Sequence, residues 1–470
     1  MSTHEGYLSE DTIAAMATPT GGAIAVLRLS GPLSFEIHEK LTQFSQKSKK
    51  LRQLVLHGIY SPEGQMFDQV LSACFAQPDS YSGEDLIEYH IHGNPWIAQR
   101  LLETLIHYGA RQALPGEFSF RAVRNGKMNL FQAQAVADLI EASNDAAVTL
   151  ALGKMSGTQT KLIEQVGHDL RDITALSEVG IDFADQDIDA VSLRRLKQRL
   201  QPIIDIIRKM EQSYSRGTQL QNGVRVAFVG LPNAGKSSFF NALLGEDRSI
   251  VSEIEGTTRD TIREKLNLRG KKTSVTLRLE DTAGLRTTLD RIEKVGIERT
   301  HEAIKNADLI LFIVDPQSSQ ASLVEQWSSI SEKLSNARTN PVIAILTKSD
   351  LNSEEIKKNT TQLLKTLGIS TIVEVSSTNG EGLSLAAEAI ADLCESTLHP
   401  HPNELLLTRL DHLQAVRDSL LHLERAIDAP EIDFFASDLR QSLSSLAPLI
   451  GDTLPDDILG KIFSNFCIGK

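Results

Sequence analysis

Residues 230–237 of the chain read GLPNAGKS, which brings two glycines, a lysine and a hydroxyl side chain close together. Glycines let the backbone N–H groups of a loop close around phosphates at a helix N-terminus, while the lysine reaches the terminal phosphates and the hydroxyl ligates Mg²⁺. The β-branched run 224–229 precedes this loop and a helix-like segment follows it, so the context favours nucleotide binding over a chance glycine-rich turn. The phosphate-contacting residues would be Asn233, Ala234, Gly235, Lys236, Ser237 and Ser238, with Ser237 as a Mg²⁺ ligand.

Two further segments fit a bound triphosphate. The sequence LRLEDTAG ends a β-like run at Asp281, which can hold Mg²⁺ through water, and the N–H of Gly284 can sense the γ-phosphate. In EIEGTTRD, Thr258 is a candidate second Mg²⁺ ligand on a loop that orders around the triphosphate. A Thr-Thr pair alone would be an ordinary solvated turn, so this assignment depends on the other motifs. The nucleotide-contacting residues expected here are Ser252, Glu253, Ile254, Glu255, Gly256, Thr257, Thr258, Asp281, Thr282, Ala283 and Gly284.

The base is selected by the segment TKSD, which follows a buried apolar run. Its Asp350 carboxylate can accept from the N1–H and the exocyclic amine of guanine, a donor pair that adenine lacks, so GTP is favoured over ATP. The usual motif begins with Asn, and we expect Thr347 to weaken its tie to the phosphate loop because a hydroxyl replaces an amide. Lys348 belongs to the same segment, and Ser376, Ser377 and Thr378 are expected to complete the base pocket.

The residue after Gly284 is Leu285, where many signalling GTPases have a glutamine that orients the attacking water. A leucine side chain cannot form a hydrogen bond, so another group must take that role. Arg286, Glu293 or a cation supplied in trans are the candidates. The plain alternative is that both side chains are solvated, as exposed charges near such loops usually are.

The composition is that of an ordinary globular protein, with 470 residues of which 41% are hydrophobic, so about two or three domains are expected. The formal net charge of −13 argues against non-specific adhesion to nucleic acid, although a local basic surface can still bind RNA. Three cysteines without a CxxC pair predict a reduced, cytoplasmic chain without structural zinc. The apolar run Leu309–Val314 is far shorter than the roughly 20 residues of a membrane span, and the acidic N-terminus is unlike a signal peptide.

The N-terminal stretch, to about Asn125, combines β-like runs at 23–29, 70–76 and 85–93 with one helical run around 96–108. This mixture predicts a small α+β domain.

Beyond that domain, apolar spacing is helical from Met128 to about Tyr214 and again near the C-terminus, where it predicts one apolar helix face. That face consists of Phe435, Leu439, Leu443 and Leu446. Between the two helical regions, β-branched runs alternate with helix-like segments, as in a parallel sheet. We therefore predict a multidomain α/β plus α fold, in which a P-loop GTPase domain with helices on both faces of its sheet is inserted into a helical domain. The predicted ranges are 1–125 for the α+β domain, 126–221 and 389–470 for the two segments of the helical domain, and 222–388 for the GTPase domain.

The segments GLPNAGKSS, EGTTRD, DTAGLR, RIEKVGIERT and IFSNFCIGK together closely resemble the MnmE (TrmE) family of tRNA-modification GTPases, over essentially the whole chain. The terminal FCIGK is the most specific of them, because a general GTPase has no reason to carry it. The resemblance implies that, with the FAD-dependent partner MnmG (GidA), the protein adds an aminomethyl or carboxymethylaminomethyl group to the wobble uridine of certain tRNAs. A heterotetramer or a larger complex is expected.

By the same resemblance, a folate, 5-formyl- or methylene-tetrahydrofolate, supplies the one-carbon unit. The matching positions for its binding are Arg28, Glu88, Lys127 and Lys470, which would otherwise be interpreted as ordinary surface charges. Cations suit the glutamate tail of a folate, and Glu88 suits its pterin N–H groups. Cys467 matches a near-terminal cysteine of the family to which a catalytic role is given by analogy, whereas the plain interpretation is a small buried side chain.

The resemblance also accounts for Leu285. In the family, GTPase domains pair across their nucleotide faces and K⁺ takes the place of an arginine finger, with a shell matching Asn233, Ser252, Ile254 and Thr257. Glu293 would then orient the water indirectly and Arg286 would stabilise the active loop. The N-terminal domain would hold the protein as a constitutive homodimer, which makes this pairing an intramolecular closure.

Two other functions compete with this interpretation. An Era-type ribosome-assembly GTPase would share the nucleotide motifs, but such chains carry an RNA-binding module after the GTPase domain, whereas a helical segment ending in FCIGK follows it here. A dynamin-like assembly protein is disfavoured by the short chain and by the lack of membrane-binding features.

Overall fold

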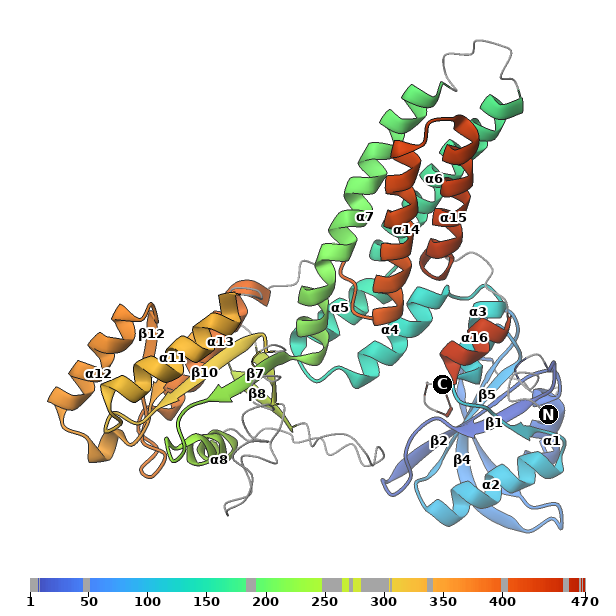
Figure 1. Cartoon of the computed structure of the whole chain (residues 1–470). Coiled ribbons are helices and arrows are strands. Elements are labelled where there is room, and N and C mark those ends of the chain that lie inside the picture. Colours follow the sequence, from blue (N-terminus) through green and yellow to red (C-terminus); the bar gives the residue numbers. More distant parts are fainter. Residues whose placement is uncertain are drawn as a thin grey trace. The chain divides into compact units, whose positions relative to one another are not determined.

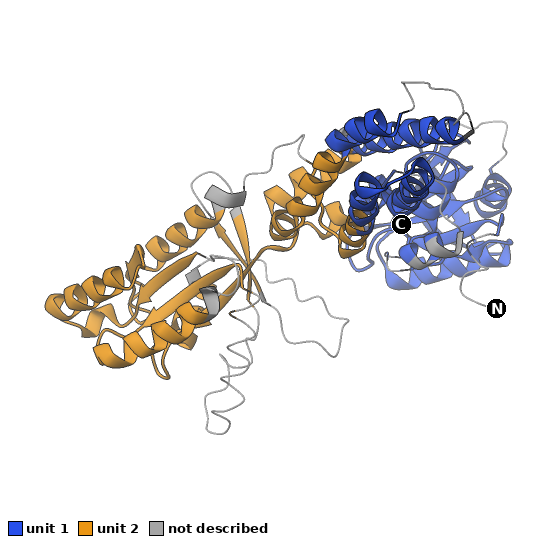
Figure 2. Ribbon diagram, turned by 45° about the horizontal axis from the view of Figure 1, so that its top comes forward, with its two compact units in different colours: residues 1–137, 160–203, 418–470 blue, residues 138–159, 204–417 orange. Residues whose placement is uncertain are grey.

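Figure 1 shows the computed structural model of the chain, which contains two six-stranded sheets and several long helices. It describes residues 7, 9–44, 51–182, 192–246, 264–269, 274–279, 304, 307–335, 341–398, 405–450, 456–464, 466, 468 and 469. The chain divides into two compact units, each built from separate stretches (Figure 2). The first comprises residues 1–137, 160–203 and 418–470, and the second comprises 138–159 and 204–417. The four domain ranges stated above stay a prediction.

The sheet of the first unit has the strand order β3-β4-β5-β2-β1-β6. Its strands are β1 (Ile13–Met16), β2 (Ile24–Ser30), β3 (Leu54–Tyr60), β4 (Met66–Phe75), β5 (Leu86–His92) and β6 (Arg111–Gln112). β1 and β6 pair in parallel, and the other neighbours pair antiparallel. Along β2, Ala25, Leu27 and Leu29 are buried while Arg28 lies on the opposite face, the alternation of a strand with one face on the core. The three predicted β-like runs are confirmed as β2, β4 and β5.

Two helices supply the other half of this core. The first is α1 (Ser34–Thr42), and the second is α2 (Pro95–His107), which confirms the predicted helical run. Leu41 of α1 and Leu105 of α2 lie in one apolar cluster with the buried side chains of β2. Asn94 caps the N-terminus of α2, and its side-chain oxygen accepts the backbone N–H of Trp96 at 2.8 Å.

The remaining helices of the first unit form a bundle and a short C-terminal helix. They include α3 (Glu117–Arg124), α15 (Ile432–Ile450), α16 (Asp456–Phe463) and the first-unit portions of α4 (Leu130–Glu141), α6 (Thr158–Asp182), α7 (Leu193–Asn222) and α14 (Leu410–Asp428). The predicted apolar face of α15 is confirmed, since Phe435, Leu439 and Leu446 are buried and Leu443 is half-buried. α16 packs on α3, with the rings of Phe120 and Phe463 edge to face. No helix among the described residues has the length and apolar character of a membrane span.

The second unit is a three-layer α/β structure. Its sheet has the order β12-β11-β10-β7-β9-β8, and β8 pairs antiparallel at one edge of an otherwise parallel sheet. The strands are β7 (Val224–Val229), β8 (Glu264–Arg269), β9 (Ser274–Leu279), β10 (Leu309–Val314), β11 (Val342–Leu346) and β12 (Thr371–Glu374).

Helices cover both faces of this second sheet, as predicted. α8 (Lys236–Glu246) and α13 (Leu383–Leu398) share an apolar cluster on one face, while α11 (Gln320–Ser335) and α12 (Glu354–Thr366) share another on the opposite face. β10 is buried along its whole length, as expected of a central parallel strand. The same unit also contains α5 (Asp145–Met155) and the short helix η4 (Ser349–Leu351).

Candidate functional site

The loop between β7 and α8 has the backbone form that a phosphate-binding loop requires. Asn233 and Gly235 adopt positive φ values of 60° and 93°. Gly230 lies so close to β10 that a Cβ there would overlap the carbonyl oxygen of Ile313. At Gly235, a Cβ would lie 3.3 Å from the Cβ of Thr347. Both motif glycines are therefore demanded by the local geometry.

Lys236 begins α8 with its side chain folded back over the loop. Its Nζ donates to the carbonyl oxygens of Gly230 at 2.8 Å and Leu231 at 2.9 Å. Burial lowers the pKa of this ammonium group. The charge is thus held over the loop at a cost in solvation, which is the placement expected of a lysine that meets phosphate oxygens.

The base-side segment is tied directly to this loop. The Thr347 hydroxyl, which is buried, donates to the carbonyl oxygen of Ala234 at 2.6 Å and lies 3.2 Å from the carbonyl oxygen of Val314. The bond from the Thr347 hydroxyl to the phosphate loop is present and short, and the expectation that it is weaker than the bond of the usual amide stays a prediction. Thr347 therefore links the two halves of the nucleotide site.

Asp350 lies in η4 with an exposed side chain, next to the carboxyl ends of β11 and β12. The preceding Lys348 has a left-handed backbone conformation with φ 55°, and its Nζ pairs with Asp315 at 2.6 Å. The backbone N–H of Ser349 donates to Val375 O at 3.2 Å, which joins this segment to the loop carrying Ser376, Ser377 and Thr378. The structure therefore brings the predicted base-side residues together.

Many residues of the predicted sites lie outside the described ranges. They are Ser252, Glu253, Ile254, Glu255, Gly256, Thr257, Thr258, Asp281, Thr282, Ala283, Gly284, Arg286 and Glu293, and also Cys467 and Lys470. Their assigned roles remain predictions. Within the described ranges, Ser237 and Ser238 follow Lys236 in the first turn of α8.

A second group of predicted residues meets on the sheet of the first unit. Arg28 and Glu88 are cross-strand partners on β2 and β5, and Arg28 Nε donates to Glu88 Oε1 at 2.8 Å. The Arg28 guanidinium also lies 5.3 Å from the ring centroid of Tyr81. Such cation–π contacts hold an arginine in place while leaving some of its fork open to a ligand.

Lys127 is exposed and adjoins the loop that carries Tyr81. A Cβ on Gly83 would lie 3.2 Å from Lys127 Cγ, and Asn125 Nδ2 donates to Ser82 O at 2.8 Å. Gly469, which precedes Lys470, lies against the backbone of Met16 at the end of β1. Met16 pairs with Leu27, so the described end of the chain is close to Arg28 in the sheet.

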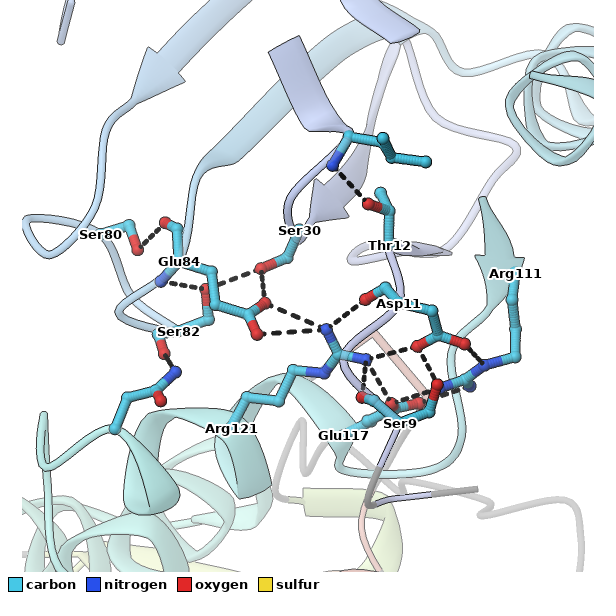
Figure 3. Close-up of polar contacts among 12 residues, drawn as sticks. Ser9, Asp11, Thr12, Ser30, Ser80, Ser82, Glu84, Arg111, Glu117 and Arg121 are labelled. Atoms are coloured by element: carbon cyan, nitrogen blue, oxygen red, sulfur yellow. Dashed lines mark hydrogen bonds and ion pairs between the residues drawn. The ribbon is translucent and has the colours of Figure 1, made fainter. Parts of the chain in front are cut away.

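A network of paired charges, some buried and some partly exposed, reaches the Tyr81 loop through Glu84 (Figure 3). Arg121, whose side chain is 3% exposed, pairs with Glu84 at 3.1 Å and with Asp11 and Glu117 at 2.9 Å each. Arg111 pairs with the same Asp11 and Glu117, both at 2.7 Å. Burial opposes ionisation of Asp11, but its bonds to the two arginines outweigh burial and keep its pKa below the usual value. Buried charges persist when partners surround them, so this network fixes the loop beneath Arg28.

The comparisons with known proteins agree across the chain. Residues 130–467 match the family model of the MnmE helical domain, and residues 12–127 match that of the GTP-binding protein TrmE N-terminus. The tRNA modification GTPase MnmE of Thermotoga petrophila is 37% identical over 471 residues, covering 98% of this chain and all of the relative. The chain belongs to the MnmE family.

Other MnmE proteins give the same result. The tRNA modification GTPase MnmE of Natranaerobius thermophilus is 36% identical and covers 98% of this chain and 100% of its own length. Among solved structures, the G domain of the T. maritima FeoB iron transporter is 28% identical over 37% of this chain and 99% of that chain, with a TM-score of 0.25. This last overlap is too limited to bear on function, and the MnmE assignment rests on the full-length relatives and the family models.

Sequence reasoning missed several residues that the structure places at these sites. Tyr81, beneath Arg28, gave no signal because an isolated tyrosine in a polar loop has no characteristic spacing. Asp315, the partner of Lys348, could have been found, since it directly follows the buried run that became β10. The pairing of Arg111 and Arg121 with Asp11, and of Arg121 with Glu84, joins residues far apart in the sequence and could not have been found from spacing.

Proposed function

We propose that this MnmE-family protein hydrolyses GTP and couples the hydrolysis to modification of the wobble uridine of certain tRNAs. The observation that carries the nucleotide half is the direct bond from Thr347 to the loop of Lys236, which connects the proposed phosphate-binding loop to the segment that carries Asp350. Family models matching residues 12–127 and 130–467 favour this function over an Era-type ribosome-assembly switch.

For catalysis, we assign phosphate binding to the backbone of Asn233, Ala234 and Gly235 and to the Lys236 ammonium. Ser237 and Thr258 would hold Mg²⁺, and the half-buried hydroxyl of Ser237 in the first turn of α8 suits this hard cation. Mg²⁺, when bound, neutralises charge on the phosphate oxygens. Since Leu285 cannot orient water, we assign that role to Glu293 and stabilisation of the active loop to Arg286.

Base selection gives a direct test. Replacing Asp350 with Asn removes a charged acceptor from the guanine N1–H and amine, so GTP affinity should fall by roughly 10²-fold. Xanthosine triphosphate, which has a carbonyl in place of the amine, should bind the variant better than GTP does. Calorimetry on Asp350→Asn measures both, and Glu355→Gln, an exposed acid on α12, is the matched control. Unchanged GTP affinity in Asp350→Asn would remove Asp350 from the pocket.

We further propose that K⁺ completes the site when two GTPase domains pair. Asn233 is exposed at the crest of the phosphate loop, where its side-chain oxygen can reach a cation, and Ser252, Ile254 and Thr257 would provide further oxygens. GTP hydrolysis should then be several-fold faster in KCl than in NaCl at equal ionic strength, because the larger ion fits the shell that a dimer closes. Equal rates in the two salts would exclude this mechanism.

The first unit supports a homodimer. On the sheet face that carries Arg28, Leu56 and Leu71 are cross-strand partners and Leu54 lies two residues along β3, and these three side chains are 40–64% exposed. A monomer rarely leaves such an apolar strip in water, and strips of this kind mark protein interfaces. Sedimentation of a Leu56→Asp variant should show a weakened dimer, and a variant that sediments like the wild type would assign the face to another partner.

For the modification, we propose that Arg28, Glu88, Lys127 and Lys470 bind 5-formyl- or methylene-tetrahydrofolate, which supplies a one-carbon unit when bound. The chemistry of the group fits: Arg28 and Lys127 are cations within reach of the Tyr81 loop, and Glu88 is an acceptor for pterin N–H groups. An FAD-dependent partner of the MnmG type and tRNA would complete a cytoplasmic complex. Cys467 is proposed as a catalytic residue of this step by its family position.

Replacing Arg28 with Ala should weaken binding of 5-formyl-tetrahydrofolate by about tenfold or more, because a charge-assisted contact is lost. Calorimetry on the full-length protein measures this, with Lys40→Ala as control, since Lys40 is an exposed cation on α1 that pairs with Glu36 one turn away. If the variant bound the folate with the same affinity as the wild type, Arg28 would be excluded from the folate-binding residues.

The whole proposal is tested by mass spectrometry of wobble uridines in tRNA from a strain lacking the protein. Loss of the aminomethyl and carboxymethylaminomethyl groups is expected. Unchanged nucleosides would overturn the modification function while leaving the GTPase assignment in place.

A further inference from the structure

A cavity of about 370 Å³ lies in the second unit, where α7 ends, β7 begins and α14 passes. Its lining includes three guanidinium groups, from Arg225, Arg278 and Arg417, and one carboxylate, from Asp308. The phosphate-binding loop follows the opposite end of β7, so this cavity is separate from the nucleotide site. In a chain with a formal net charge of −13, three arginines at one cavity are a local exception.

The sheet places two of the lining arginines next to each other and beside a further cation outside the lining. Arg278 on β9 pairs with Arg225 on β7 and with Lys265 on β8, so three cations stand in one cross-strand row. Like charges directly opposite each other on a sheet are destabilising. Asp308 offsets the charge of Arg225, and an anion bound beside the row would add a further negative charge.

The carboxylate in the lining is directed at one of these cations. Asp308 accepts from Arg225 through Nε and Nη2 at 3.0 Å each, and from its backbone N–H at 3.0 Å. Both carboxylate oxygens of Asp308 therefore accept hydrogen bonds from Arg225, and these bonds fix the orientation of the Arg225 guanidinium group. Arg417 pairs with Glu211 at 2.9 Å, but their side chains are 55% and 28% exposed, so solvent weakens that pair.

We propose that this cavity binds a phosphate group of an RNA backbone, an inference that rests on the proposed action on tRNA. Arginine forks match the oxygens of a phosphate. The cavity is larger than one phosphate, and the rest of its lining suits a nucleotide. The Gln219 amide can bind a ribose 2′-OH, the Thr218 hydroxyl, which itself donates to the Tyr214 carbonyl oxygen, can accept from one, and Tyr214 brings an aromatic side chain to the lining. This polar and aromatic surround favours RNA over a free phosphate ion.

The test measures binding of a fluorescently labelled tRNA transcript to the full-length protein over a range of salt concentrations. Arg278→Gln and Arg417→Gln should each weaken binding by roughly tenfold and lower the salt slope by about one, because one phosphate contact is lost. Arg278→Lys should recover some of the affinity, since it keeps the charge without the fork. Lys365→Gln, an exposed cation on α12 near the opposite sheet edge, should bind like the wild type.

Three outcomes would overturn the inference. If the wild type binds tRNA and both glutamine variants bind it equally well, the cavity is not an RNA site, while the proposed function stands. If the variants lose affinity for inorganic pyrophosphate but keep it for tRNA, the ligand is a free phosphate compound. If the wild type itself binds no tRNA, the proposed function fails and this inference fails with it. Thermal melting of each variant separates loss of binding from loss of fold.

Discussion

Replacing Lys236 with Ala is expected to lower kcat/KM for GTP by about 10²–10³-fold, because a preorganised charge is removed from the developing charge on the phosphates. The folded protein should lose little stability. The Lys236 ammonium donates to two carbonyls of its own loop, and burial lowers its pKa, so the fold bears a cost to keep this charge in place. A large loss of kcat/KM with an unchanged Tm would show that the Lys236 ammonium group serves GTP hydrolysis and not the stability of the fold.

Steady-state hydrolysis and thermal melting of Lys236→Ala measure the two quantities together. Lys365→Ala is the control, because it removes the same charge from an exposed position on α12. A kcat/KM within about threefold of the wild type would show that the loop does not act on the triphosphate.

Replacing Lys154 with Met is expected to lower the free energy of unfolding of the second unit by about 3–5 kcal/mol, since a buried carboxylate is left without its counter-ion. Lys154 is 2% exposed, and its Nζ donates to Asp138 at 2.8 Å and to Thr408 at 2.6 Å. Burial lowers the pKa of Lys154, and the neighbouring Asp138 charge opposes that shift. These contacts join α5 to the end of α4 and to the segment before α14.

The double variant Lys154→Met with Asp138→Leu is the matched control. Removing both charges should restore most of the lost stability, because no buried charge of the pair remains uncompensated. Trp327 lies in the second unit and Trp96 in the first, so urea unfolding followed by fluorescence in a Trp96→Phe background reports on the second unit. Hydrogen exchange of the backbone amides of α5 measures the loss of stability in that helix alone. Equal stability of the single and double variants would contradict the ion-pair interpretation.

The features of the site that could be predicted are those that depend on residues close together in the sequence. The loop of Lys236 and the position of Asp350 followed from motifs that pair a buried strand with fixed polar residues, and both lie at strand ends as expected. Strand and helix identities were also accessible where the period was clear, as in α15. Such features depend on neighbouring residues, so one sequence is enough to find them.

What could not be predicted depends on contacts between distant segments. The bond from Thr347 to Ala234 spans 113 positions and exists because β7, β10 and β11 are adjacent in the sheet. The pairing of Arg28 with Glu88 likewise depends on the register of β2 and β5. The family resemblance assigned both residues of that pair to a ligand, but the register that lets them bond to each other appears only when the strands are paired.

The junction of α7 and β7 sets the angular phase of the helix. Gly223 alone separates the two elements, with φ 94°, and a Cβ there would lie 2.7 Å from the carbonyl oxygen of Thr276. Each successive residue of an α-helix turns its side chain by about 100° around the axis. Adding or removing one residue at this point would rotate Tyr214 and Gln219 of α7 away from the side of the helix that lies beside Arg225. The length of the junction is therefore more constrained in evolution than the residue types on this helix face.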